Sequence, residues 1–530
     1  MGEIEVSSVT AFEFIWSTAV LDPEKSVTFY KPVGIPRGFH ILGHYCQPSD
    51  KPLRGFLLVA KETGIQFPKT TEEKLPALRN PLDFTLVWCS NAPSSLEISS
   101  GCGYFWLPKP PQGYKAVGYL VTDTPEKPNL DKISCVRSDR TDKCEPHRVT
   151  FAVTTGIPGS SFKLWSSRPS DRGMLGKGVS VGSFLCSSGL SIEQESPIAC
   201  LKNINTVLQS MPNLLQVHRL INHYGPTVFF HPDEIYLPSS VEWYFSNGAL
   251  LYRKDMPTGK EIDATGSSLP SGGSNDGEFW IDLPIDDLKD YIQHGNLESA
   301  KLYVHVKPAL GGTFTDIAMW LFCPFNGPAT LKFPMIDIPL GCIGEHVGDW
   351  EHITLRICNF AGELYSIYFS QHSGGEWIDA CDLDYVEGNK AAVYSSKNGH
   401  ASYPRPGIYV QGSSSIGIGI RNDAVRSNLY VDSSIYYEIV AAEYLQNAIV
   451  EPDWLQFRRK WGPSITYDPK TALDNFINAF PSMFQDSMRG WINMLPAELF
   501  GEEGPTGPKE KDNWIHDERW RHHDKVSGCF

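Results

Sequence analysis

The sequence predicts a mainly-β protein: an N-terminal repeated β-domain, built as a β-prism or as stacked β-sandwiches, followed by a β-sandwich domain with peripheral helices. Aromatic residues make up 12% of the chain, and its 46 glycines and 39 prolines favour short strands joined by many turns. A motif near the N-terminus recurs along the chain, and apolar residues alternate with polar ones in many segments. At 530 residues the chain exceeds one ordinary core, which predicts two or more domains.

The first half of the chain contains an internal repeat. The segment PRGFHILG at 36–43 returns as PQGYKAVG at 111–118, and each copy follows an aromatic residue and a proline. A looser third copy begins at Trp165 and runs through GVSVG at 178–182. Because a single repeat of this kind cannot bury a core alone, the copies predict one repeated domain. We assign residues 1–204 to it and expect a binding or adaptor-like surface without catalytic residues.

The pattern changes near residue 204, where we place the domain boundary. Apolar residues then recur at helical spacing, which predicts a helix from about Asn205 to His223. Residues 205–530 are expected to form the β-sandwich domain, with a helical extension at the C-terminal end. A polar tail follows from Gly501 to Asn513, and we interpret it, with the later pair His522 and His523, as solvated chain.

The bulk properties exclude several kinds of partner. A formal net charge of −15 argues against a nucleic-acid backbone and against simple attachment to anionic lipid. No segment has the roughly 18 consecutive apolar residues of a membrane helix. Glu3 and Glu5 occupy positions where a secretory leader has basic residues. Twelve cysteines without a C-x-x-C pair favour reduced thiols. We therefore expect a cytoplasmic protein without a transmembrane segment.

The segment GEHVGDWEH at 344–352 is the strongest candidate for a functional site. Alternation after Gly348 predicts a strand whose one face carries the carboxylates of Asp349 and Glu351 next to three apolar residues. Burying both charges unpaired would cost several kcal/mol each, and a cation at the strand end removes that cost. With His346 turned back towards them, the three side chains suit calcium, manganese or zinc. The alternative is a surface loop with solvated side chains.

Other polar turns are candidates for a shared ligand-binding cleft. The set comprises the side chains of the turn at 371–377, the later loop at 394–400 and the tryptophan of the metal segment: His372, Glu376, Trp377, His400 and Trp350. Singly, each histidine is more often a hydrogen-bonded turn residue than a ligand. A secondary candidate is His231, Asp233 and Glu234, whose proline-rich frame is equally a rigid entry into the domain.

With these residues in view, the chain resembles a known family along nearly its whole length. Its opening GEIEVSSVTAFEFIWS, the block HPDEIYLPSSVEWYF and the segments HVGDWEHITLRI, SQHSGGEW and YSSKNGHASYP are characteristic. They are similar to the plant proteins grouped as vacuolar protein sorting-associated protein 62, also called domain of unknown function 946. The family name implies a part in delivering proteins to the vacuole, with a sorting partner and a location peripheral to endomembranes or the vacuole.

A shorter resemblance bears on the candidate metal site. Necrosis- and ethylene-inducing-peptide-like proteins carry G-H-R-H-D-W-E on a β-sandwich, and its first His, Asp and Glu ligate a divalent cation that docks sphingolipid head groups. The pattern H-x-x-D-W-E matches His346, Asp349 and Glu351 here, while Gly348 replaces the second histidine. A further acidic ligand lies upstream in that family, and Asp337 is the nearest candidate. The resemblance implies a metal-binding β-sandwich.

These patterns favour a non-enzymatic binding protein related to vacuolar protein sorting. It would use a divalent metal to recognise a polar lipid head group or glycan at membranes. One alternative is a membrane-damaging, pore-forming defence or insecticidal toxin-like protein of the same architecture. Another is a metal-dependent hydrolase, against which the absence of a recognisable nucleophile–base pair or metalloprotease motif counts.

Overall fold

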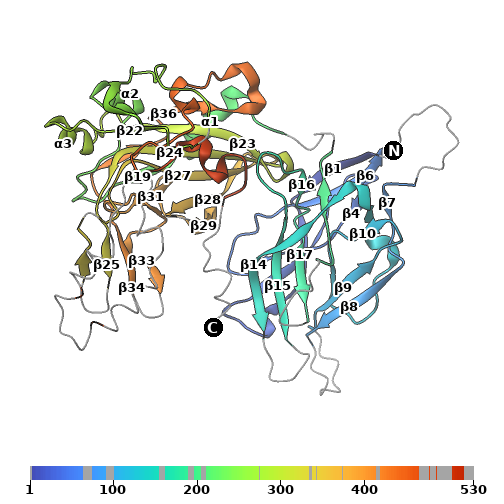
Figure 1. The fold of residues 1–530 in the computed structure, drawn as a ribbon. Helices are drawn as coiled ribbons and strands as arrows, with labels where there is room; N and C mark the ends of the chain where they lie inside the picture. The colour runs from blue at the N-terminus through green and yellow to red at the C-terminus, as the bar shows by residue number, and fades with distance from the viewer. Residues whose placement is uncertain are drawn as a thin grey trace, which may run out of the picture. The chain divides into compact units, whose positions relative to one another are not determined.

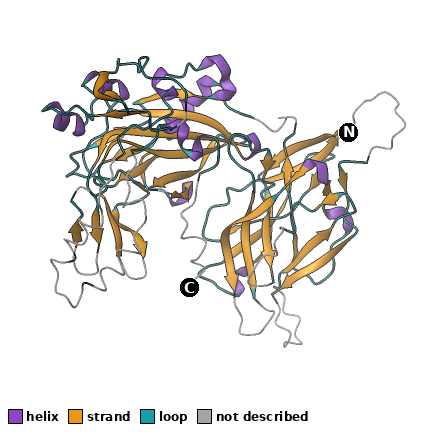
Figure 2. Ribbon diagram, in the orientation of Figure 1, coloured by secondary structure: helices purple, strands orange, loops and turns teal. Residues whose placement is uncertain are grey.

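The structure is a computed structural model in which strands dominate (Figures 1 and 2). It describes residues 3–63, 75–90, 101–153, 161–188, 196–204, 210–273, 275–332, 337–341, 343–372, 374–413, 418–464, 477, 485 and 504–518. The chain divides into two compact units. Unit 1 is Met1–Met211 with Pro308–Phe314 and Asn359–Ala361, and unit 2 is Pro212–Lys307 with Thr315–Cys358 and Gly362–Phe530. In the described residues, no helix is long and apolar enough to cross a membrane.

The strands of unit 1 form three successive repeats of the same pattern. Each repeat contributes two three-stranded sheets, ordered β2-β3-β5 and β1-β6-β4 in the first repeat, β8-β9-β11 and β7-β12-β10 in the second, and β14-β15-β17 and β13-β18-β16 in the third (Figure 1). The strands are β1 (Glu3–Val9), β2 (Phe12–Ser17), β3 (Val27–Pro32), β4 (His40–Ile41), β5 (Tyr45–Pro48), β6 (Leu57–Thr63), β7 (Leu78–Arg79), β8 (Asp83–Cys89), β9 (Tyr104–Lys109), β10 (Tyr114–Lys115), β11 (Leu120–Thr122), β12 (Cys135–Arg137), β13 (Thr141–Asp142), β14 (Cys144–Val153), β15 (Phe162–Pro169), β16 (Gly178–Val179), β17 (Phe184–Ser187) and β18 (Cys200–Lys202).

A ring of backbone hydrogen bonds joins the three repeats. The second repeat donates one N–H to the first, the third to the second and the first to the third, and all three N···O distances are 2.9 Å. Gly118 stands where the repeats meet, because a Cβ there would lie 2.6 Å from the Leu42 carbonyl oxygen. Three repeats closed into a ring match the prism alternative, and the sequence echo at 36–43 and 111–118 marks the residues that close it. The bonds run from Leu58 to Val181, from Ser134 to Ile41 and from Ala199 to Ala116.

A buried histidine of unit 1 gives a testable pH dependence. His44 is buried, its Nδ1 accepts the N–H of Val121 at 3.0 Å, and burial, with Lys31 adding, lowers its pKa from 6.5 to about 3. Below pH 6.5 the imidazole of His44 is therefore protonated in the unfolded chain but stays neutral in the folded unit. We expect His44 to cost about 1.4 kcal/mol of stability per pH unit as the pH falls from 6.5 towards 3.

The variant His44→Asn tests this dependence because its amide oxygen retains an acceptor near Val121 but does not titrate. Urea unfolding of wild type and variant across this pH range should give different slopes, with the variant losing less stability on acidification. Parallel slopes would rule out His44 as the source.

Unit 2 is built around a six-stranded sheet of order β29-β28-β27-β24-β23-β36. A five-stranded sheet (β30-β31-β19-β35, with β32 on β31), the four-stranded β26-β25-β34-β33 and the three-stranded β21-β20-β22 surround it. The strands are β19 (Thr227–Phe229), β20 (Leu250–Arg253), β21 (Met256–Glu261), β22 (Phe279–Asp282), β23 (Leu302–Ala309), β24 (Phe314–Asn326), β25 (Thr330–Lys332), β26 (Asp337–Pro339), β27 (His346–Cys358), β28 (Glu363–Gln371), β29 (Gly374–Asp379), β30 (Tyr385–Glu387), β31 (Lys390–Ser395), β32 (Ser402–Tyr403), β33 (Gly407–Ser413), β34 (Ile418–Ala424), β35 (Tyr430–Asp432) and β36 (Tyr437–Ala441).

In the described part of the chain, the helices with defined ends are few and short. The predicted helix is α1 (Leu214–Tyr224), which begins later than expected because Asn213 caps it, and Gln216 completes a capping box; residues 205–209 lie outside the described part. The other α-helices are α2 (Val241–Ser246) and α3 (Leu288–Gln293). The 3-10 helices of the described residues are η1 (Thr18–Val20), η2 (Leu130–Lys132), η3 (Ser138–Arg140), η4 (Leu310–Gly312), η5 (Ala380–Asp382), η6 (Glu443–Ala448), η7 (Asp453–Gln456), η9 (Pro508–Glu510) and η10 (Asp512–Trp514).

The six-stranded sheet separates two cores of unit 2. On β27, Ile353, Leu355 and Ile357 pack into an aliphatic core, as the alternation predicts. Trp350 packs on the opposite face, in an aromatic core with Trp454 and Trp461. Asp349 and Glu351 lie near the N-terminal end of β27, before the residues that pack into the aliphatic core.

Candidate functional site

The N-terminal end of β27 lies on the wall of a cavity of about 640 Å³ in unit 2. The end of β24, the β33–β34 hairpin, the loop after β31 and part of the segment 504–518 complete the wall. The polar side chains of the wall are therefore drawn from segments far apart in the sequence. Those used below are His346, Asp349, Glu351, His352, Ser370, His372, Arg421, Asn422, Glu510, Lys511, Asp512, Asn513 and Glu518.

A glycine turn sets the orientation of His346. Gly348 has φ of +67°, and a Cβ added there would lie 2.4 Å from the carbonyl oxygen of Trp461. The Gly348 carbonyl lies 2.7 Å from Nδ1 of His346, and burial lowers the pKa of that histidine. A carbonyl only accepts, so the proton of the neutral ring resides on Nδ1 and the lone pair on Nε2. This tautomer is the one that histidine ligands of metals commonly adopt.

Asp349 is buried and paired with a histidine from another loop. Its Oδ2 lies 2.9 Å from Nδ1 of His400, whose Nε2 lies 2.8 Å from the carbonyl oxygen of Tyr236. Because both partners are acceptors, both ring nitrogens of His400 donate. Burial alone would lower the pKa of His400, but Cys323 and Asp349 outweigh it and hold the pKa well above its usual value. Burial opposes the ionisation of Asp349, yet the bond from His400 keeps its pKa below the usual value.

Glu351 is the second carboxylate of the wall. Ser370 donates its hydroxyl to Oε2 of Glu351 and accepts the backbone N–H of His352 at 3.2 Å. Burial, with the neighbouring Asp349 adding, raises the pKa of Glu351 to about 7. Two carboxylates held this close in a dry setting disfavour joint ionisation unless a positive charge lies beside them.

The structure thus brings three of the four predicted metal ligands to one wall and leaves the fourth outside it. Asp337 begins β26, where Lys332 pairs with it at 3.1 Å and Arg421 forms a second ion pair. It is not among the residues of the cavity wall. The expectation that Asp337 joins the ligands was wrong, because the β25–β26 pairing directs it towards two cations. In the described residues, no group of three or more His, Cys, Asp or Glu is ready placed for a metal.

The predicted ligand-binding residues separate into two groups. His372 lines the cavity, with φ of +51° and its Nε2 3.0 Å from Oδ1 of Asn422. His400 lies behind the wall, bonded to Asp349. Glu376 accepts from Gln371 at 2.9 Å, Trp377 lies under the guanidinium of Arg356 at 4.1 Å, and neither lines the cavity. Trp350 packs in the aromatic core and also lines the cavity, so its role as a ligand contact stays a prediction.

The secondary candidate serves the loops around the site. Glu234 is buried and accepts the backbone N–H groups of Ile235, Tyr236 and Asn398, the last at 2.6 Å. It therefore joins the strand entry to the loop that carries His400. His231 only accepts the N–H of Asp233 within its turn, and the Asp233 side chain is 75% exposed.

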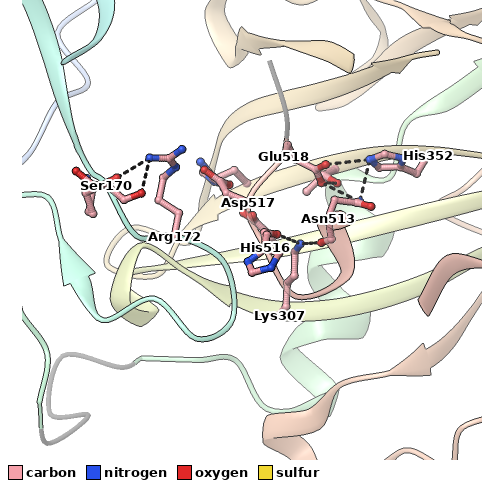
Figure 3. Close-up of polar contacts among 12 residues, drawn as sticks. Ser170, Arg172, Lys307, His352, Asn513, His516, Asp517 and Glu518 are labelled. Atoms are coloured by element: carbon pink, nitrogen blue, oxygen red, sulfur yellow. Dashed lines mark hydrogen bonds and ion pairs between the residues drawn. The ribbon is translucent and has the colours of Figure 1, made fainter. Parts of the chain in front are cut away.

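Residues 504–518, which we call the C-terminal strap, were not among the predicted site residues. The tail up to Asn513 was expected to be solvated, yet the strap supplies Lys511, Asn513 and Glu518 to the cavity wall. Figure 3 shows the ammonium of Lys307 between the carbonyl oxygens of Asn513 and His516, the latter at 2.9 Å, and His352 beside Glu518 at 3.0 Å. Trp514 was the available signal, because a tryptophan is unusual in a solvated tail. Residues 519–530, with His522 and His523, lie outside the described part.

The strap covers a polar face of the central sheet. Thr354 donates to Glu518 at 2.6 Å, and Trp514 stacks on His305 with ring centroids 3.9 Å apart. The Glu518 carboxylate is fully buried, and its bonds from His352 and Thr354 hold its pKa below the usual value against the cost of burial. The strap is therefore an integral part of unit 2, fixed by side chains of β23 and β27.

The family model of vacuolar protein sorting-associated protein 62 matches residues 1–518. The chain belongs to this family. Among curated relatives, vacuolar protein sorting-associated protein 62 of Saccharomyces cerevisiae is 27% identical over 173 residues, 29% of this chain and 35% of that protein. The putative vacuolar protein sorting-associated protein TDA6 of the same yeast is 23% identical over 287 residues, 46% of this chain and 59% of that protein. The matches thus span about a third and under two thirds of these relatives.

Solved structures offer weaker likenesses to this family member. GNIP1Aa from Chromobacterium piscinae has a TM-score of 0.30 at 17% identity, covering 38% of this chain and 37% of that one. NLPPya in complex with glucosamine has a TM-score of 0.22 at 13% identity, covering 41% and 76%. At these scores neither structure bears on the function of this chain.

Proposed function

We propose that unit 2 binds a divalent cation at His346, Asp349 and Glu351, and that the loaded cavity recognises a polar lipid head group or glycan during vacuolar protein sorting. The observation that carries the proposal is the donor set on the cavity wall. Each of the three side chains uses one atom in its bonds to described residues, which leaves His346 Nε2, Asp349 Oδ1 and Glu351 Oε1 as donors. An imidazole with two carboxylates suits calcium, manganese or zinc.

The residues around these three side chains orient them for a cation through hydrogen bonds. The Gly348 carbonyl fixes the His346 ring, and His400 and Ser370 fix the two carboxylates, as outer-shell bonds do in metal sites. A bound cation would neutralise the carboxylate pair and offer coordination positions to ligand oxygens. The cavity of about 640 Å³ has room for a head group or a monosaccharide. We further propose a cytoplasmic site of action, peripheral to endomembranes or the vacuole, in keeping with the family description.

The double variant His346→Ala with Asp349→Ala tests the cation site. We expect it to lose stoichiometric binding of calcium, manganese and zinc, measured by elemental analysis after dialysis and by titration calorimetry. The matched control is His231→Ala with Asp233→Ala, which removes the same residue types from a turn outside the cavity wall and should bind as wild type does. Equal metal content in wild type and the first double variant would refute the proposal, provided that circular dichroism shows both are folded.

Vesicle assays separate recognition from membrane damage. Flotation of wild type with vesicles of plant lipids, with and without chelator, should show cation-dependent binding and no release of an entrapped dye. Dye release would favour the toxin-like alternative instead.

A further inference from the structure

We propose that the ligand of this cavity carries a phosphate group, which pairs with Lys511 of the C-terminal strap while the cation holds its other side. This inference rests on the proposed function and adds the chemical class of the ligand to it. It follows from the groups on the cavity wall whose bonding capacity is unused. Those groups are of two kinds, carboxylates on β27 and hydrogen-bond donors elsewhere.

Lys511 differs from the other lysines that contact the strap. Lys307 is bonded to the carbonyl oxygens of Asn513 and His516, and Lys509 to Glu451 and Gln456. The ammonium groups of Lys307 and Lys509 thus already have hydrogen-bond partners within the protein. Among the described residues no hydrogen-bond or ion-pair partner of the Lys511 ammonium is found, although Lys511 lines the cavity. An ammonium kept unpaired beside a cavity is a recognition group for an anion.

The position of Lys511 within the cavity is set by its neighbours. Lys511 lines the same cavity as His346, Asp349 and Glu351, and its charge acts on all three. The strap fixes it there, because η9 and η10 flank it and Glu518 and Asn513 dock against His352. Lys397 and Arg421 also line the cavity, and the guanidinium of Arg421 is already bonded to Asp423 at 2.8 Å and to Asp337.

Trp320 also lines the cavity, but its indole N–H has almost no accessible surface and therefore offers no bond to a ligand. The wall thus calls for a ligand with acceptor oxygens both for the Lys511 ammonium and for the cation.

A phosphate meets both needs once the cation is bound. Divalent cations commonly join one or two protein carboxylates to phosphate oxygens, and lysine pairs with phosphate as a point charge. Without the cation, the carboxylates of Asp349 and Glu351 would repel the same phosphate. Binding of phosphate and of cation should therefore be mutually dependent.

The test compares wild type, Lys511→Met and Lys254→Met, which removes the same charge from an exposed turn of unit 2 outside the cavity wall. Inositol monophosphate with the cation that wild type binds best is the soluble probe, and titration calorimetry is the readout. We expect Lys511→Met to weaken phosphate binding about tenfold or more, as the loss of a charge-assisted bond does. Lys254→Met should bind as wild type does, and Lys511→Arg should retain most of the affinity.

A second arm distinguishes the source of the phosphate. Vesicles of phosphatidylcholine containing phosphatidylinositol phosphate present it on a lipid, and their binding should be lost with Lys511→Met and with chelator. If inositol monophosphate binds and these vesicles do not, the ligand is a soluble phosphate.

The failures of the two proposals are distinct. If wild type binds no cation, the proposed function fails and this inference with it. If wild type binds the cation but Lys511→Met retains full affinity for phosphate, or if neutral glucosamine binds as well as inositol monophosphate, only the phosphate inference is overturned. Tighter cation binding by Lys511→Met with unchanged phosphate affinity would assign Lys511 as a mere counter-charge to the carboxylates.

Discussion

Replacing Arg356 by methionine is expected to lower the free energy of unfolding of unit 2 by about 3–5 kcal/mol, the usual cost of removing one partner from a buried ion pair. Arg356 lies on β27, and its Nε and Nη2 bond both carboxylate oxygens of Asp316 at 2.8 and 2.7 Å. Nη2 also bonds Asp517 of the strap at 2.7 Å. Asp316 is 1% exposed, so its charge has no access to water.

Arg356→Met removes the guanidinium partner of two carboxylates, those of Asp316 and Asp517. Burial raises the pKa of Asp316 in the wild type, and the attraction of Arg356 opposes that rise. Without the guanidinium the folded-state pKa of Asp316 rises further above its unfolded value. A raised folded pKa gives stability that is present at low pH and lost as the pH increases. The free energy of unfolding that Arg356→Met loses relative to wild type should therefore be smaller near pH 5 than near pH 7.

Urea unfolding followed by tryptophan fluorescence measures the effect, because the tryptophan core of unit 2 reports its unfolding. Arg253→Met is the matched control. It breaks an exposed pair with Glu278 at 3.0 Å and should cost less than about 1 kcal/mol. Similar losses in both variants would mean that the Arg356 network contributes no more than a surface ion pair.

The same network explains why local sequence patterns recovered one part of the site and missed another. The alternation after Gly348 is a property of a single strand, and it correctly separated Ile353 and Leu355 from Thr354 and Arg356. Thr354 and Arg356 have partners in the strap that lie more than 160 positions away in the sequence. No periodicity within β27 encodes a contact of that range.

The partner of Asp349 was hidden for a related reason. His400 reaches it only because the loop after β31 is held by Glu234, whose carboxylate accepts the N–H of Asn398. The chemistry of Glu234, Asp349 and His400 marks each of them in the sequence, but only as separate candidates. Their connection depends on the folding of three segments onto one another.

The N-terminal repeat was easier to predict because its signal is local and recurs. Gly43 and Gly118 stand at equivalent positions of the first two repeats, and a Cβ on Gly43 would lie 3.0 Å from Cα of Gly118. The closeness of these backbones is what restricts both positions to glycine. The third repeat places Ser183 at this point, which is why its sequence echo is looser.

Gly348→Ala is the second substitution for which we expect a large effect. Its φ of +67° disfavours a side chain by about 1–2 kcal/mol. The added Cβ would also lie 2.4 Å from the carbonyl oxygen of Trp461, and relieving such an overlap costs about 1–3 kcal/mol more. Urea unfolding should therefore give a loss of about 2–5 kcal/mol for unit 2.

The control Gly362→Ala separates the two contributions. Gly362 has φ of +70° and no heavy atom within 4 Å of an added Cβ, so it carries the backbone strain without the overlap. Equal losses of unfolding free energy in the two variants would show that the overlap with the Trp461 carbonyl oxygen is relieved without cost.

The substitution at Gly348 also bears on the candidate metal site. Gly348 supplies the carbonyl that orients His346 Nδ1 at 2.7 Å, and Trp461 fixes that peptide from behind. Displacing the peptide would rotate the imidazole while leaving His346, Asp349 and Glu351 chemically intact. If the cation is held by these three side chains, folded Gly348→Ala must bind it more weakly than Gly362→Ala does. The geometry of the turn, and not only the presence of the ligands, would then determine the affinity.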